Sequence, residues 1–127
     1  MPEKHLYEYA VVRLVPRVER EEFLNVGVIL YCRPQRFLDM RFELDERRLR
    51  AFSEDTDPGE LQALLSAFAR VCRGEQEGGP IALLDMPSRF RWLTAYRSTV
   101  LQTSRVHPGF CRDAREMLEC LYRDLVL

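Results

Sequence analysis

The amino-acid sequence predicts an α+β fold: a mainly antiparallel sheet with helices packed on one of its faces. Two observations support this prediction. Up to Leu44, apolar residues alternate with polar ones or run together in short segments, as they do in strands. After Leu44, helical periodicity and helix-capping residues prevail, with one later strand before a final helix. The sheet is therefore expected to contain a meander of three strands plus that later strand.

The meander is expected at residues 7–15, 26–32 and 37–44. The first segment is rich in β-branched and aromatic residues and ends at Pro16. Both of its faces are largely apolar, which predicts a central position in the sheet. The second segment is an almost unbroken apolar run, and the third alternates strictly between apolar and polar residues. Short connections between the three favour antiparallel pairing.

Helix signals follow. Asp45 can cap a short helix that reaches Phe52, and the segment from Asp57 to Glu60 combines an N-cap acid with proline at the first helical position. Gly74 ends the helix that begins there. The apolar stripe expected to face the core consists of Leu61, Leu64, Leu65, Phe68, Val71 and Cys72.

The last third of the chain should hold a short helix capped by Ser88, a strand at residues 99–106 and a terminal helix at residues 113–126. The Pro108-Gly109 pair is expected to break the strand.

Composition predicts one domain, residues 1–127, with 46% apolar residues and enough core to fold without disulfides or metals. The sequence has no apolar run long enough to cross a membrane and no secretory signal pattern at its start, so we expect a cytoplasmic protein with no membrane partner.

The four cysteines are Cys32, Cys72, Cys111 and Cys120, which are far apart and form no C-x-x-C pair. Each falls within an apolar pattern, where a free thiol behaves as a small hydrophobe. We expect four reduced thiols, no metal site and no cofactor.

Arginine is the dominant cation: 18 of the 19 Lys and Arg residues are arginine. Codon bias explains this better than nucleic-acid binding does, and a net charge of −1 argues against nucleic acid as a partner. Local clustering is a separate observation. Residues 87–112 hold five arginines and a histidine beside several hydroxyl groups, and contain no carboxylate. Such groups hold phosphate or carboxylate oxygens, so this segment is a candidate anion- or partner-binding surface.

Two polar residues in the strands need an explanation. Arg13 interrupts an apolar strand face, so it should have a partner such as Glu22 or a ligand, unless it extends to the sheet edge. Asn25 precedes Gly27, and glycine inside a strand marks a bulge or a close approach of another backbone or of a ligand.

The richest polar group is Arg97, Ser98, Thr99, Gln102, Ser104 and His107. Three interpretations stay open for it: catalysis through His107, binding of an anion or partner, and a structural network. Catalysis would need an orienting acid and an oxyanion hole, and the sequence has no G-x-S-x-G nucleophile elbow. We expect the segment from Arg97 to His107 to join Arg13 and Asn25 in one polar pocket, because buried polar groups must find partners.

The same residues carry a family resemblance. The segments Tyr9–Arg17, Glu22–Val28, Arg89–Leu93 and Arg97–Val100, followed by Ser104 and Val106-His107, resemble family 3037 of the bacterial domains of unknown function. The family has no established activity, so the resemblance transfers no catalytic residue. It implies an association with genes beside a HipA-like kinase domain, and hence a regulatory or partner role.

Two hypotheses follow. The first is a non-enzymatic binding or accessory module for a partner protein or anionic ligand, with a HipA-like kinase-domain protein as the partner that the resemblance implies. The alternative is a small hydrolase or nucleotide-handling enzyme that uses His107 with Arg13, Arg97 and Ser98. The first is favoured because it requires only a cationic, hydroxyl-rich surface.

Overall fold

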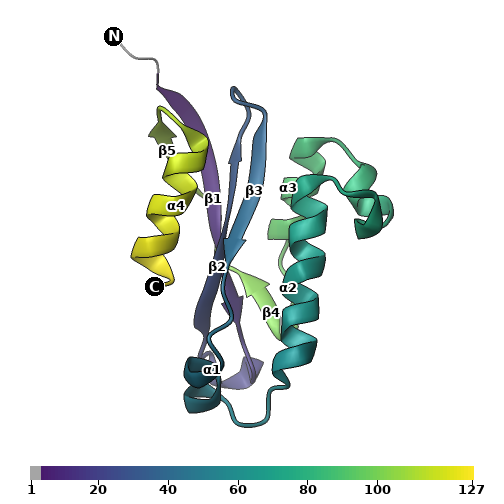
Figure 1. The fold of residues 1–127 in the computed structure, drawn as a ribbon, viewed down its shortest axis with the longest axis vertical. Coiled ribbons are helices and arrows are strands. Elements are labelled where there is room, and N and C mark those ends of the chain that lie inside the picture. The colour runs from purple at the N-terminus through teal and green to yellow at the C-terminus, as the bar shows by residue number, and fades with distance from the viewer. Residues whose placement is uncertain (1–3) are drawn as a thin grey trace.

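A computed structural model describes residues 4–127 (Figure 1). Within these residues, the sheet has five antiparallel strands in the order β3-β2-β1-β4, and β5 pairs with β1 beside β4. The strands are β1 (His5–Leu14), β2 (Leu24–Cys32), β3 (Phe37–Phe42), β4 (Leu101–Thr103) and β5 (His107–Cys111). The helices are α1 (Glu46–Phe52), α2 (Pro58–Arg73), α3 (Met86–Thr94) and α4 (Ala114–Leu125). Short 3-10 turns lie at η1 (Val18–Arg20), η2 (Gln76–Gly78) and η3 (Pro80–Leu83). The predicted α+β class is confirmed.

An aspartate begins each α-helix. Asp45, Asp57, Asp85 and Asp113 accept backbone N–H groups of the first turns of α1, α2, α3 and α4. This satisfies donors that have no partner inside a helix and places a negative charge at the positive end of the helix dipole. The predicted cap of α3 was wrong: Ser88 lies in the first turn and donates its N–H to Asp85.

Helices cover both faces of the sheet, whereas the prediction placed them on one face. In Figure 1, α2 and α3 lie on one side of the sheet and α4 lies on the other. Val12, Leu14 and Ile29 belong to a core with α2 and α3, whereas Val28 and Leu30 belong to a second core with α4. The reason is visible in the sequence, because β1 and β2 are apolar on both faces and each face needs a cover.

The core-facing stripe of α2 is narrower than predicted. Leu61 and Leu65 are 1% and 0% exposed, but Leu64 is 41% exposed. Helical periodicity allows either edge of a wide apolar stripe to face outward, and packing against β3 selects the side that carries Leu61 and Leu65.

The Pro108-Gly109 pair does not break the sheet but lies inside β5. Proline is tolerated there because β5 is at the edge, where a missing N–H costs no ladder hydrogen bond. Gly109 is opposite Tyr7 in β1, and a Cβ at position 109 would lie 2.5 Å from the Tyr7 ring. The buried Tyr7 ring therefore occupies the space that a side chain at position 109 would need.

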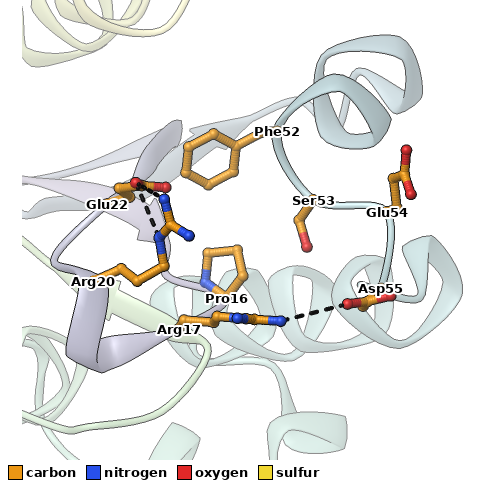
Figure 2. A pocket seen from close by; sticks show the side chains of 8 residues that line it. All are labelled: Pro16, Arg17, Arg20, Glu22, Phe52, Ser53, Glu54 and Asp55. Carbon is orange, nitrogen blue, oxygen red and sulfur yellow. Dashed lines mark hydrogen bonds and ion pairs between the residues drawn. The ribbon is translucent and has the colours of Figure 1, made fainter.

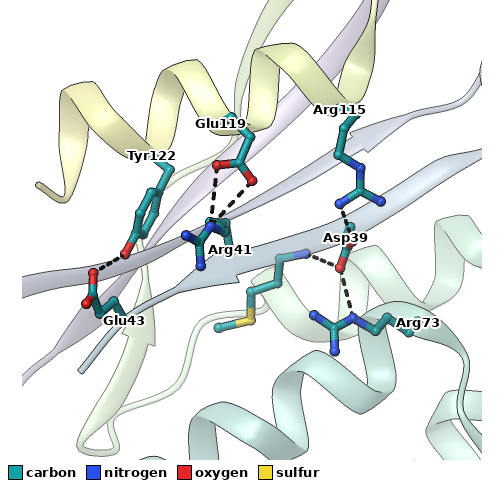
Figure 3. Close-up of polar contacts among 8 residues, drawn as sticks. Asp39, Arg41, Glu43, Arg73, Arg115, Glu119 and Tyr122 are labelled. Carbon is teal, nitrogen blue, oxygen red and sulfur yellow. Dashed lines mark hydrogen bonds and ion pairs between the residues drawn. The ribbon is translucent and has the colours of Figure 1, made fainter.

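Asp39 connects the two helical layers around the edge of β3 (Figure 3). Its carboxylate accepts from Arg73 of α2 at 3.2 Å and from Arg115 of α4 at 2.8 Å. It also accepts the backbone N–H of Met40 at 2.8 Å. This arrangement, called the Asp39 clasp below, satisfies a backbone donor of the outer strand and covers it with two arginines.

Tyr122 of α4, the helix that also carries Arg115, has a buried phenol whose titration should be measurable. Tyr122 is 1% exposed and donates its hydroxyl to Glu43 at 3.0 Å. Burial, then the hydrogen bond to Glu43 and the charge of that carboxylate, raise the pKa of Tyr122 to about 12 from its ordinary value of 10.0.

We expect the free energy of unfolding to fall as the pH rises from 10 to 12. The unfolded chain loses the Tyr122 proton near its ordinary pKa, while the folded chain retains it, so ionisation favours unfolding by an amount on the order of 2 kcal/mol. Urea titrations across this pH range measure the effect. The Tyr122→Phe variant should lose stability less steeply, and identical slopes for the two proteins would contradict the assignment.

Candidate functional site

A β-bulge in β2 assembles the first polar group. Val12 pairs with Gly27, but Arg13 pairs with Asn25, so Val26 is an extra residue in β2. The bulge reverses the alternation of side chains: Val26 enters the core with α2, and Asn25 turns to the face that α4 covers. A Cβ at Gly27 would lie 2.9 Å from the carbonyl oxygen of Arg41, so the predicted bulge and close backbone approach are both confirmed.

Three of the predicted polar residues therefore form one row across the sheet. Arg13 pairs with Asn25 of β2 on one side and with Gln102 of β4 on the other. Residues directly opposite each other in antiparallel strands project from the same face, about 5 Å apart at Cβ. Asn25 donates its side-chain amide to the carbonyl of Leu125 at 3.0 Å, and Gln102 donates to the carbonyl of Thr99 at 2.9 Å.

Arg13 is half-buried and its guanidinium lies over the ring of Phe23, 4.0 Å from the ring centroid. Within residues 4–127 it has no carboxylate within ion-pair distance, and Glu22, its predicted partner, instead pairs with Arg20 at 2.8 Å. Two buried atoms in this row, Arg13 Nε and Asn25 Oδ1, have no hydrogen-bond partner among the described residues. Arg13, Asn25, Gln102 and Phe23 are called the Arg13 row below.

Phe23 is the member that the sequence analysis missed. It is 45% exposed and lies just before β2, after two glutamates. An isolated aromatic residue within a charged connection was the available signal, because aromatic rings hold guanidinium groups against their faces.

Ser104 and Thr99 have structural hydrogen bonds. Ser104 is 5% exposed, and its hydroxyl accepts the N–H of Val11 at 2.8 Å and donates to the carbonyl of Arg105 at 2.9 Å. It therefore supplies an acceptor to β1 in the gap between β4 and β5. The Thr99 hydroxyl donates to the carbonyl of Leu101 at 2.9 Å.

His107 and Ser98 are far apart. His107 begins β5 opposite Tyr9, with their ring centroids 5.3 Å apart. Ser98 is exposed near the other end of β1, where Val15 donates its N–H to Val100 at 2.6 Å. Tyr9 and Val15 are six positions apart along the extended chain, a distance of about 20 Å.

Arg97 lies on the opposite side of the sheet from Arg13. Its guanidinium donates to the carbonyls of Trp92 at 2.7 Å and Leu93 at 2.9 Å, at the end of α3. It also lies over the rings of Phe68 and Trp92, 5.1 Å and 4.9 Å from their centroids. Burial lowers the pKa of this guanidinium. The predicted single pocket is therefore wrong: Arg13, Asn25 and Gln102 come together, while Arg97, Ser98 and His107 lie elsewhere.

A separate hollow of about 310 Å³ opens between the β1–β2 connection and the α1–α2 connection (Figure 2). It is lined by Pro16, Arg17, Arg20, Glu22, Phe52, Ser53, Glu54 and Asp55. Arg20 is paired with Glu22 inside the hollow, and Arg17 lies 3.9 Å from Asp55 across it. Both arginines of the hollow therefore have carboxylates nearby, which distinguishes them from Arg13.

Within residues 4–127, no three His, Cys, Asp or Glu side chains are grouped so as to hold a metal ion. No helix of the described chain is both long enough and apolar enough to span a membrane.

Comparison with known proteins gives one match. A family model described as "Protein of unknown function (DUF3037)" matches residues 9–126. Neither a curated protein nor a solved structure matches the chain.

Proposed function

The chain belongs to the DUF3037 family, whose description assigns no activity, and we propose that it is a non-enzymatic binding module. Its ligand is an anionic group, carboxylate or phosphate, presented by a partner protein to Arg13. The observation that carries the proposal is the unpaired, half-buried guanidinium of Arg13 within the Arg13 row.

Electrostatics support an external partner. A guanidinium taken partly out of water loses hydration that only a carboxylate, a phosphate or several carbonyls can replace. Arg97 has two carbonyl acceptors, whereas Arg13 has an aromatic ring and no acid among residues 4–127. Phe23 holds the guanidinium by its face. Because Nε is buried, an anion would bind the guanidinium through its terminal Nη donors.

The enzymatic alternative has less support. It combines His107 with Arg13, Arg97 and Ser98, but these residues lie at both ends of β1 and on both faces of the sheet. Nucleophilic catalysis requires the nucleophile and its base within hydrogen-bond reach. Ser98 and His107 are separated by roughly the length of six extended residues, about 20 Å.

The partner to test first is a HipA-like kinase-domain protein encoded beside such a domain, which the family resemblance implies. Binding through a guanidinium and an aromatic ring requires only one acidic side chain or phosphorylated residue on that partner.

The test is isothermal titration calorimetry of the intact protein with that kinase-domain protein, using Arg13→Gln and the matched control Arg70→Gln. Arg70 is an exposed arginine of α2, on the other side of the sheet. We expect Arg13→Gln to weaken binding roughly tenfold or more, the usual effect of removing a charged hydrogen-bonding partner, and Arg70→Gln to leave it unchanged.

A second readout is independent of the identity of the partner. In protein labelled with ¹⁵N-arginine, the Nε–H signal of Arg13 should shift and saturate on addition of inorganic phosphate or acetate, while that of Arg70 should not. If neither the kinase-domain protein nor either anion affects Arg13 differently from Arg70, the proposed function is wrong.

A further inference from the structure

The two edges of the sheet are treated differently. At the β3 edge, the Asp39 carboxylate accepts the outward N–H of Met40, and Arg73 and Arg115 cover this hydrogen bond. At the other edge, β5 makes its extensive contacts with β1, and no helix of the described chain makes extensive contact with it. An uncovered edge is a template on which another strand can pair.

The hydrogen-bonding direction of β5 follows from its neighbour. Val11 accepts the N–H of Ser104 at 2.8 Å, so its carbonyl points towards β4 and β5. Alternation along β1 then points the backbone groups of Tyr7 towards Gly109. Phe110 and Pro108 must therefore direct their backbone groups outward. Because proline has no N–H, Phe110 provides the one outward donor within β5.

Apolar side chains surround this donor. Phe110 is 65% exposed, and its cross-strand neighbour Leu6 is 49% exposed. Around the end of β5, Phe110 also borders a groove of about 360 Å³ towards α4, lined in part by Cys111, Met117 and Cys120. Exposed apolar surface continuous with a free strand edge is the pattern of a protein interface.

We propose that this edge is a homodimer interface in which β5 pairs antiparallel with β5 of a second copy, centred on Phe110. A twofold axis at that position lets the N–H of each Phe110 donate to the carbonyl of Phe110 in the other copy. The pairing therefore uses the one outward donor of β5 and needs none from Pro108.

A second copy fits this edge better than an arbitrary strand for two reasons. The register centred on Phe110 opposes Gly109 to Cys111 and Pro108 to Arg112, so the single outward N–H of each β5 meets the outward carbonyl of Phe110 in the other copy. It also places the two Phe110 side chains together beside the two Leu6 side chains, which covers the apolar patch from both copies. This inference does not involve Arg13 and is independent of the proposed function.

The experiment is sedimentation equilibrium of the intact protein over a roughly hundredfold range of concentration, because dimerisation shifts with concentration by mass action. We expect a monomer–dimer equilibrium. Phe110→Asp, which places two like charges opposite each other, should raise the dissociation constant roughly tenfold or more. The control Tyr96→Asp, at a side chain that is 89% exposed before β4, should leave it unchanged.

A second variant and a second measurement keep the test independent of folding defects. Leu6→Ser leaves the β5 backbone intact and should also weaken the dimer. Amide hydrogen exchange of Phe110 should slow as the protein concentration rises. A protein that stays monomeric throughout, or a dimer that survives both Phe110→Asp and Leu6→Ser, overturns the proposal.

Discussion

Leu65→Ala is expected to lower the free energy of unfolding by about 3–5 kcal/mol, whereas Leu64→Ala should lower it by less than about 1 kcal/mol. Leu65 is fully buried between α2 and the sheet, so its truncation removes apolar contact and leaves a cavity. Leu64 is 41% exposed, and its truncation leaves no enclosed space. The two residues are adjacent, so helix propensity and sequence context are closely matched.

Urea denaturation of both variants measures the difference directly, with circular dichroism to confirm that the native helix content is kept. Leu61→Ala provides a second buried position in the same helix, since Leu61 is 1% exposed. If Leu64→Ala and Leu65→Ala lowered the free energy of unfolding equally, α2 would have to present a different side to the sheet.

Arg97→Ala is expected to lower the free energy of unfolding by about 2–3 kcal/mol, a large effect for an arginine. The change removes two charge-assisted hydrogen bonds to the carbonyls that end α3 and the contacts with two aromatic rings. It also removes a cation from the negative end of the helix dipole.

The conservative change Arg97→Lys should recover only part of the loss, because an ammonium group cannot reach both carbonyls as a planar fork does. The control is Arg91→Ala on the exposed face of the same helix, for which we expect less than about 0.5 kcal/mol. Denaturant titration of the three variants tests the structural role of Arg97. A cost for Arg97→Ala no larger than that for Arg91→Ala would contradict it.

The sequence predicts the elements well where its signals are local. The N-cap of α2, its proline at the first position and its glycine end occur as expected, since Asp57, Pro58 and Gly74 each satisfy or release specific backbone groups. The period of two likewise identifies β3. In contrast, the division of residues 101–111 into β4 and β5 depends on Ser104, whose hydroxyl bonds to β1 from a distant part of the chain. A local pattern does not contain that information.

The candidate site shows the same limit. Arg13 was singled out because it interrupts an apolar strand, and it does lie beside Asn25 and Gln102. That neighbourhood depends on the bulge at Val26, because without the extra residue Asn25 would face the other side of the sheet. The sequence places Arg97 with Arg13 because buried polar groups must find partners, and one shared pocket would satisfy both. The geometry of the α3 carbonyls, which are its actual partners, is a property of the folded chain.

The central position of β1 has a consequence for how the protein is made. The strand leaves the ribosome before its partners and can pair with β2 soon afterwards, but its other edge pairs with β4 and β5. The bond between Val11 and Ser104 joins residues 93 positions apart. At elongation rates of about 5–20 residues per second, this edge of β1 waits roughly 5–20 s for its partners. During that interval the nascent chain exposes an unpaired apolar strand edge, the kind of surface through which incompletely folded chains aggregate.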